Sequence, residues 1–184
     1  MVRAFVALEM PERIREQIRR EQRHLKTEFP RARWTRPEGQ HLTLKFLGET
    51  TAQKLARLKK EVIDRVGVLP AVTVRLHGAG FFPSALRPRV AWIGGEAPGG
   101  AAVAAAVEEA AVASGYPREG REWSLHLTQA RLDRAWSRNL VERFIEWGRT
   151  LELEPFTCRE IVLFASELRP GGAVYTSLER FPLE

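Results

Sequence analysis

Cysteine is nearly absent from this sequence, which has Cys158 alone among its 184 residues. A single cysteine cannot form a disulfide within the chain, and no Cys or His stands near it at metal-ligand spacing, so we expect a small buried residue. No run approaches the roughly 18 uninterrupted apolar residues that a membrane-spanning helix needs. The first ten residues, MVRAFVALEM, are too short and too soon followed by charges for a secretory signal. We therefore expect a cytoplasmic protein.

Lysine is also scarce, supplying five of the 29 basic residues, so arginine carries almost all of the excess charge. The formal net charge is +6 and the isoelectric point is about 10.1. Arginine suits two-pronged hydrogen bonding to phosphate, and a basic balance favours polyanionic partners such as RNA. Codon bias toward Arg and Ala explains the same composition, so charge alone does not decide the function.

Histidine occurs only four times, yet two of the four begin the same three-letter word, in "HLTLKFLG" from residue 41 and in "HLTQAR" from residue 126. Residues two apart on a strand share a face. His41 and Thr43 therefore share one face and Leu42 lies on the other, and His126 and Thr128 repeat the arrangement. The remaining two histidines are predicted to be ordinary structural or surface residues.

Hydrophobic periodicity predicts strands and helices in both halves of the chain, which suggests two related lobes in one compact unit of residues 1–184. Strands are expected near residues 2–8, 41–47, 71–78, 88–95, 126–131, 159–168 and 173–181, the last two joined by the turn "RPGG". Helices are expected near 11–29, 50–67, 100–114 and 134–148. A cleft between the lobes is the natural place for a ligand.

Two histidines and two threonines converging from matching strands suit phosphodiester cleavage without a metal. Histidine has an unperturbed pKa near ~6.5, so one ring can take a proton from water while the other gives one to the leaving oxygen. Threonine hydroxyls can bind the non-bridging oxygens. No third His, Cys or carboxylate stands at zinc-ligand spacing, so we expect no metal and no cofactor.

The two HLT words resemble the paired motifs of the two-histidine phosphoesterase superfamily. Nearly the whole chain resembles its bacterial and archaeal branch of RNA 2',3'-cyclic phosphodiesterases, also called 2'-5' RNA ligases, through "RAFVALEMPE", "RWTRPEGQHLTLKFLGET", "GAGFFPSALRPRVAWIG" and "EIVLFASELRPGGAVYTSLERFPL". The resemblance implies an α/β (α+β) bilobal fold with a pseudo-twofold axis. Two mostly antiparallel sheets would face a central cleft, with the helices outside.

The resemblance also implies an activity and roles for individual residues. The activity is hydrolysis of a terminal 2',3'-cyclic phosphate on RNA to a 2'-phosphomonoester. His41 would be the general acid on the 3' oxygen and His126 the base that activates water. Thr43 and Thr128 would bind phosphate oxygens, and Arg131 matches the arginine that closes the second motif.

The partner implied is RNA ending in a 2',3'-cyclic phosphate, for example tRNA fragments, with reversible 2'-5' joining as a side activity. No membrane and no metal partner is expected, and we expect a monomer. Two other readings stay open. One is a non-catalytic module that binds RNA ends or phosphate, and the other is a cyclic phosphodiesterase acting on a small nucleotide. The glycines of "IGGEAPGG" lack the spacing of a dinucleotide-binding motif.

Strand parity gives expectations for four further residues. Lys45 is expected on the same face of the strand as His41, where it would add positive potential to the cleft. Phe5 faces away from its aliphatic neighbours and could stack on the terminal base, or else pack between the lobes. Gln129 departs from the apolar residue usual in the family and should lie on the helix-packing face. Arg131 shares that parity, so it reaches phosphate only where the strand ends or bulges.

Overall fold

The computed structural model of the protein describes residues 1–29, 31–170 and 172–184. Within these residues the strands form two antiparallel sheets. The four-stranded sheet has the order β3 (Leu42–Thr50), β1 (Val2–Leu8), β8 (Glu160–Arg169) and β9 (Gly172–Pro182). The five-stranded sheet has the order β2 (Ala32–Trp34), β6 (Leu127–Leu132), β5 (Val90–Glu96), β4 (Val72–Phe82) and β7 (Phe156–Cys158).

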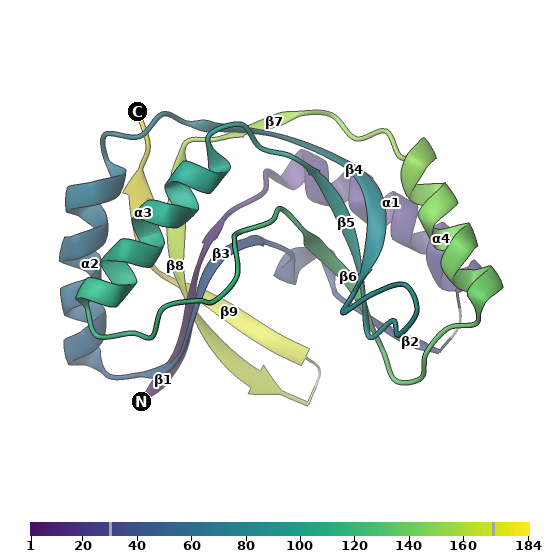
Figure 1. The fold of residues 1–184 in the computed structure, drawn as a ribbon, viewed down its shortest axis with the longest axis horizontal. Coiled ribbons are helices and arrows are strands. Elements are labelled where there is room, and N and C mark those ends of the chain that lie inside the picture. The colour runs from purple at the N-terminus through teal and green to yellow at the C-terminus, as the bar shows by residue number, and fades with distance from the viewer. Residues whose placement is uncertain (30, 171) are drawn as a thin grey trace.

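The two sheets curve toward each other, and the helices cover their outer sides (Figure 1). Helices α2 (Ala52–Val66) and α3 (Gly100–Ala113) lie together beside the four-stranded sheet, where α3 contacts β3. Helices α1 (Glu12–Glu28) and α4 (Arg138–Thr150) cover the five-stranded sheet, where α4 contacts β4. The expected α/β class, with two antiparallel sheets and external helices, is confirmed.

The two halves of the chain exchange strands between the sheets. In each half two strands pair locally, β1 with β3 and β5 with β6. The next long strand of each half crosses to the other sheet, so that β4 pairs with β5 and β8 pairs with β1. The first helix of each half also packs on the sheet of the other half: α1 on the five-stranded sheet and α3 on the four-stranded sheet. The exchange joins the two halves, while each sheet keeps one HLT strand, β3 in the four-stranded sheet and β6 in the five-stranded sheet.

Element ends follow local chemistry. Helix α4 begins at Arg138, later than the expected residue 134, because the side chain of Ser137 caps it by accepting a hydrogen bond from the backbone N–H of Leu140. Trp136 therefore precedes the helix and is buried against Phe29. Strand β4 runs to Phe82, past the expected residue 78. The short strand β7 was not predicted, and the expected "RPGG" turn includes residue 171, which lies outside the described residues.

Apolar side chains from both sheets and all four helices form the interior. Close packing needs a glycine where α4 meets β4, because a Cβ on Gly148 would lie 2.3 Å from the Cβ of Ala79. Across the described ranges, no helix combines the length and the apolar character needed to cross a membrane.

Candidate active site

Both HLT strands carry a β-bulge at the same place in the motif. Thr43 pairs with Ala7 and Lys45 with Val6, so Leu44 has no partner of its own on β1. In β6, Thr128 pairs with Trp92 and Ala130 with Ala91, so Gln129 is the extra residue. A bulge shifts the alternation of faces by one residue.

The shift decides which later side chains share the threonine face. Lys45 and Ala130 are buried, whereas Phe46 and Arg131 are exposed. The bulge thus meets the condition under which Arg131 could face the site. It also makes Phe46, which the sequence did not single out, the counterpart of Arg131 in the first motif.

The two imidazole rings are held in the same way. Nδ1 of His41 donates to the carbonyl oxygen of Gly39 at 2.9 Å, and Nδ1 of His126 donates to that of Ser124 at 3.0 Å. A carbonyl oxygen only accepts, so Nδ1 carries a proton in both rings. Nε2 of each ring is then free to accept a proton from a ligand when neutral and to donate one when charged.

Aromatic rings enclose His41. Phe5 stacks on it with centroids 4.3 Å apart, and Tyr175 meets it edge to face at 5.0 Å. Burial lowers the pKa of His41 to about 4, helped by the positive charges of Arg15 and His126 and opposed by the hydrogen bond to Gly39.

Phe5 is only 3% exposed and has no open face for a nucleotide base. The expected stacking of Phe5 on the substrate is therefore wrong, and its ring supports His41 instead. Lys45 lines the cavity, but its charge is paired with carboxylates. Lys45 is 3% exposed, and its ammonium is neutralised by Glu108 at 2.9 Å and Glu119 at 3.4 Å.

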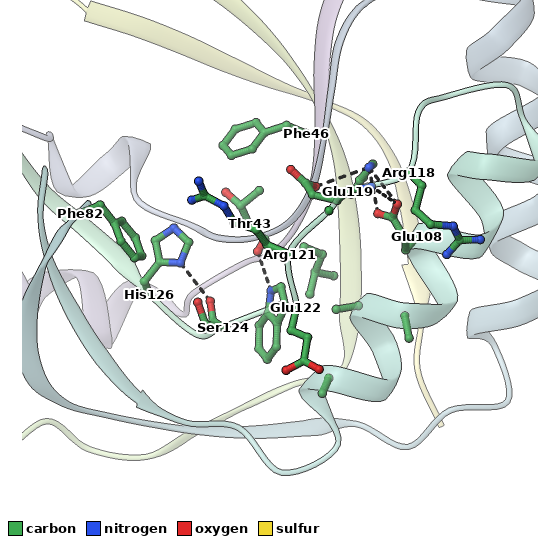
Figure 2. Close-up of a pocket in the computed structure, with 17 residues that line it drawn as sticks. Thr43, Phe46, Phe82, Glu108, Arg118, Glu119, Arg121, Glu122, Ser124 and His126 are labelled. Carbon is green, nitrogen blue, oxygen red and sulfur yellow. Dashed lines mark hydrogen bonds and ion pairs between the residues drawn. The ribbon is translucent and has the colours of Figure 1, made fainter. Parts of the chain in front are cut away.

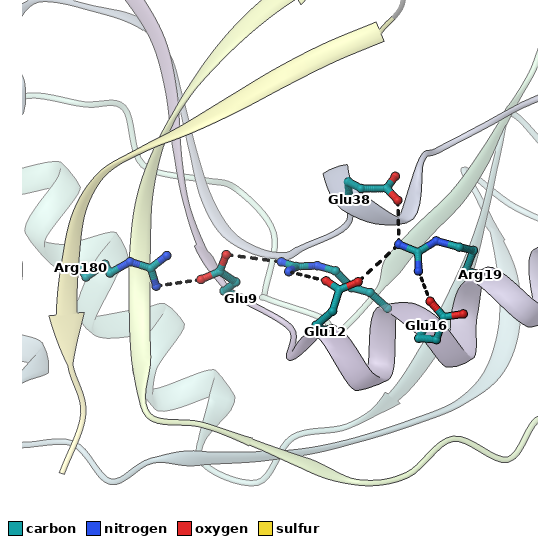
Figure 3. Close-up of polar contacts among 7 residues, drawn as sticks. Glu9, Glu12, Glu16, Arg19, Glu38 and Arg180 are labelled. Atoms are coloured by element: carbon teal, nitrogen blue, oxygen red, sulfur yellow. Dashed lines mark hydrogen bonds and ion pairs between the residues drawn. The ribbon is translucent and has the colours of Figure 1, made fainter.

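The segment before His41 is tied to α1. Gly39 belongs to the short 3-10 helix η1 (Pro37–Gly39), and Glu38 in this turn pairs with Arg19 of α1 at 2.7 Å (Figure 3). A backbone hydrogen bond and the Arg19 guanidinium lower the pKa of the Glu38 carboxyl. Such exposed pairs contribute little stability, and this one joins α1 to the turn that carries the acceptor for His41.

A cavity of about 830 Å³ opens between β3, α3 and the loop that leads into β6. Thr43, Phe46, Phe82 and His126 line it, and Figure 2 shows their side chains around a common space. Phe82 meets the ring of His126 edge to face at 4.9 Å. Phe46 is 56% exposed and is an open aromatic face at this cavity. His41 and Thr128 are not among its lining residues.

Arg131 comes from the other sheet, and its positive charge acts on Tyr175, whose ring meets His41 edge to face. Burial raises the pKa of Tyr175, and the positive charges of Arg131 and Arg3 oppose this rise. Arg3, Ser166 and Tyr175 stand side by side across β1, β8 and β9. Tyr175 was not singled out from the sequence, because nothing in the sequence places β9 beside the first motif.

Comparison with known proteins decides the family. A family model described as "LigT like Phosphoesterase" matches residues 8–92. An "RNA 2',3'-cyclic phosphodiesterase" from Methanothermobacter thermautotrophicus is 32% identical over 183 residues, covering 99% of both chains. The chain belongs to the LigT-like phosphoesterases. The protein of the same name from Escherichia coli K12 is 32% identical, over 98% of this chain and 96% of its own.

Solved structures agree with this LigT-like assignment. A crystal structure of E. coli LigT complexed with 3'-AMP has a TM-score of 0.77 and 28% identity, covering 99% of this chain and 98% of that one. Another phosphoesterase structure has a TM-score of 0.78 with 28% identity, covering 99% of this chain and 98% of the other. The resemblance seen in the sequence is therefore confirmed, both as a family and as a fold.

Gln129 lies on the helix-packing side, as expected from strand parity. It is fully buried, and its Oε1 accepts a hydrogen bond of 3.1 Å from Nε2 of Gln22 on α1. Nε2 of Gln22 also donates to the carbonyl of Thr35 at 3.0 Å. The polar residue has thus gained a polar partner on the facing helix.

Cys158 is buried as expected, and burial raises the pKa of its thiol to about 12. Among the described residues of this LigT-like chain, no three His, Cys, Asp or Glu side chains gather at a spacing that could hold a metal ion.

Proposed function

We propose that this LigT-like phosphoesterase hydrolyses the terminal 2',3'-cyclic phosphate of RNA to a 2'-phosphomonoester. The observation that carries the proposal is the matched pair of histidines, one before each bulged HLT strand, each with Nδ1 held by a carbonyl and Nε2 left free. Full-length relatives named as RNA 2',3'-cyclic phosphodiesterases support the substrate and the reaction.

The reaction needs one proton removed and one delivered on opposite sides of phosphorus. Water forms the new P–O bond as a histidine takes its proton, the P–O3' bond breaks, and the other histidine protonates the 3' oxygen. The product has a 2'-phosphate and a free 3' hydroxyl. We assign His41 as the acid and His126 as the base. Thr43 and Thr128 donate hydrogen bonds to the non-bridging oxygens, and Arg131 balances their charge.

The surroundings of His41 couple this assignment to substrate binding. Its lowered pKa keeps the ring neutral in the ligand-free protein at neutral pH. An anion close to an imidazole stabilises the charged form and raises its pKa. A bound cyclic phosphate would therefore load His41 with the proton that it delivers, so that the acid is formed where and when the substrate is present.

The natural substrate we propose is an RNA end, such as a tRNA fragment, met in the cytoplasm. If a 5' hydroxyl replaces water in the same geometry, the product is a 2'-5' phosphodiester, which gives reversible joining. We also propose that residues 1–184 act as one domain and as a monomer. Each histidine comes from a different sheet, and the halves exchange strands, so neither half can supply the pair.

The decisive experiment incubates the protein with a short RNA that ends in a 2',3'-cyclic phosphate, in the presence of EDTA, and identifies the product by mass and by chromatography against 2'- and 3'-phosphate standards. We expect the 2'-phosphate, and no product from the His41→Ala or His126→Ala variants. A 3'-phosphate product would show that the 2' oxygen leaves and not the 3' oxygen. Binding of the RNA end without any product would favour the non-catalytic binding module.

A further inference from the structure

The loop between α3 and β6 forms one wall of the cavity and is fastened to β3 at two points. We call residues 117–124 the wall loop. Nε1 of Trp123 donates to the carbonyl oxygen of Thr43 at 2.9 Å, and Nζ of Lys45 donates to that of Pro117 at 3.0 Å. A Cβ on Gly100 would lie 2.9 Å from the Trp123 ring, so the indole is also packed tightly against the start of α3.

A buried ion pair strengthens the second of these fastenings, which Lys45 makes. Nζ of Lys45 lies 2.9 Å from Oε2 of Glu108. The backbone N–H of Glu119 in the wall loop donates to Oε1 of the same carboxylate at 2.7 Å. Releasing the loop would break both hydrogen bonds that it makes with the buried Lys45–Glu108 pair, and a buried ion pair that loses hydrogen-bond partners is destabilised. The wall loop is therefore a fixed part of the cavity (Figure 2).

Three cationic side chains line the cavity: Lys45, Arg118 and Arg121. Lys45 is paired with Glu108, and Arg118 forms a two-pronged pair with Glu109 at 2.7 and 3.1 Å. Within the parts of the chain that the structure describes, Arg121 makes no hydrogen bond or ion pair through its side chain. In Figure 2 its guanidinium extends toward the space beside Thr43 and His126.

We propose that Arg121 binds the non-bridging oxygens of the terminal phosphate, as a substrate-binding residue supplied by the wall loop. This inference rests on the proposed function and adds a residue to it. A guanidinium matches phosphate with two parallel N–H donors, and a cation on a fixed support stabilises charge without further reorganisation. Arg131, whose positive charge acts on Tyr175, would supply a second guanidinium from β6.

The test compares Arg121→Gln with Arg118→Gln, a matched control three residues away on the same loop whose charge is already paired. The measurement is the dissociation constant of adenosine 2'-monophosphate by calorimetry. This ligand carries the phosphomonoester of the product and no internucleotide phosphate. A charge-assisted pair of this kind predicts binding about 10- to 100-fold weaker in Arg121→Gln and a change below about 2-fold in Arg118→Gln. Arg121→Lys should fall between them.

Several results would overturn the proposal. Equal losses in the two Gln variants would mean that only the overall charge matters, and no loss in Arg121→Gln would remove the residue from the site. No measurable binding by the wild-type protein would have the same effect, as would a loss seen with an RNA oligomer but not with the mononucleotide. Equal melting temperatures of the two variants establish that folding is not the cause.

Failure of this inference can be told apart from failure of the proposed function, because binding is measured without turnover. A protein that binds the mononucleotide through Arg121 but leaves the cyclic phosphate intact would refute the hydrolase alone. A protein that hydrolyses the cyclic phosphate equally well with and without Arg121 would refute the role of Arg121 alone.

Discussion

The ring of Phe5 lies on the ring of His41, with centroids 4.3 Å apart and planes inclined by 28°. This contact shields the imidazole from water, and burial is the main cause that lowers its pKa to about 4. In a Phe5→Ala variant water can reach the ring, so the pKa of His41 should rise toward ~6.5. The titration of the His41 carbon-bound protons, followed by NMR from pH 3 to 8, measures the change.

Phe29→Ala is the matched control for this variant. Phe29 is as deeply buried as Phe5 but packs in a different cluster, against Trp136 and Phe144. It should lower the overall stability by a similar amount while leaving the His41 titration where it is. A His41 titration that does not move in Phe5→Ala would show that something other than the stacked ring sets the pKa.

The lowered pKa of His41 also makes stability depend on pH. In the unfolded chain the group titrates near ~6.5, so between about pH 4 and 6.5 the unfolded state binds more protons than the folded state. The contribution of His41 to the free energy of unfolding is fully present above about pH 6.5 and is lost as the pH falls toward 4. From pH 7 to pH 5, His41 should account for about 2 kcal/mol of lost stability.

Urea unfolding of the wild-type protein and of His41→Asn at both pH values isolates this contribution, because the variant lacks the titrating group. The wild-type protein should lose more stability than the variant over this interval. Parallel losses in the two proteins would contradict the prediction, whatever the total effect of acid.

The assignment of acid and base can be tested with sulfur at the leaving position. In a substrate whose 3' bridging oxygen is replaced by sulfur, the leaving group is a thiolate. It needs no proton, because thiols are far more acidic than alcohols. Turnover of this substrate should then recover in the variant that lacks the acid, but not in the variant that lacks the base. We expect this substrate to restore turnover by at least about 100-fold in His41→Ala and not in His126→Ala. Rescue of His126→Ala alone would show that His126 is the acid and His41 is the base.

Gln22 and Gln129 form a buried polar pair whose value a double-mutant cycle can measure. Gln129→Leu leaves Nε2 of Gln22 with only the Thr35 carbonyl, so we expect a loss of about 1 to 2 kcal/mol in the free energy of unfolding. Adding Gln22→Leu removes the amide that has lost its partner, but it also deprives the Thr35 carbonyl of its donor, so the double variant should recover only part of the loss. Hydrolysis should be unchanged in both variants, since the pair lies on the face that packs on α1.

Sequence patterns predicted the parts of this structure that depend on local periodicity. The strand of each HLT motif, four helices and the division into two sheets follow from the spacing of apolar residues and from the family resemblance. The crossing of β4 and β8 to the opposite sheets was not predicted, because the choice of a strand's neighbour depends on contacts far away in the sequence. Tyr175 was missed for the same reason.

Side-chain directions beyond the motif were predicted less well, and a single cause explains the errors. Parity arguments assume a regular ladder, and both HLT strands bulge directly after the threonine. The bulge buries Lys45 and turns Phe46 outward in the first motif, and it exposes Arg131 in the second. A bulge depends on how the partner strand pairs, and the sequence of the strand itself carries no sign of it.

Phe46 is the residue for which this error matters most, because its exposed ring at the cavity is open to the stacking that was expected of Phe5. It is 56% exposed and lines the cavity next to Thr43, so its face is open to a nucleotide base. Stacking of a base on an aromatic ring contributes about 1 to 3 kcal/mol, so Phe46→Ala should raise KM for an RNA end by about 10-fold or more. The chemical step does not involve the ring, so kcat should stay within about 2-fold of the wild-type value.

Leu168 supplies the matched control for Phe46→Ala. It is a large apolar side chain, 72% exposed, near the tip of the β8–β9 hairpin and not among the residues that line the cavity. Leu168→Ala should leave both kinetic constants unchanged, and Phe46→Tyr should restore KM because it keeps the aromatic face. An unchanged KM in Phe46→Ala would place the terminal base elsewhere. A fall in kcat with constant KM would instead mean that the ring acts through the position of Thr43.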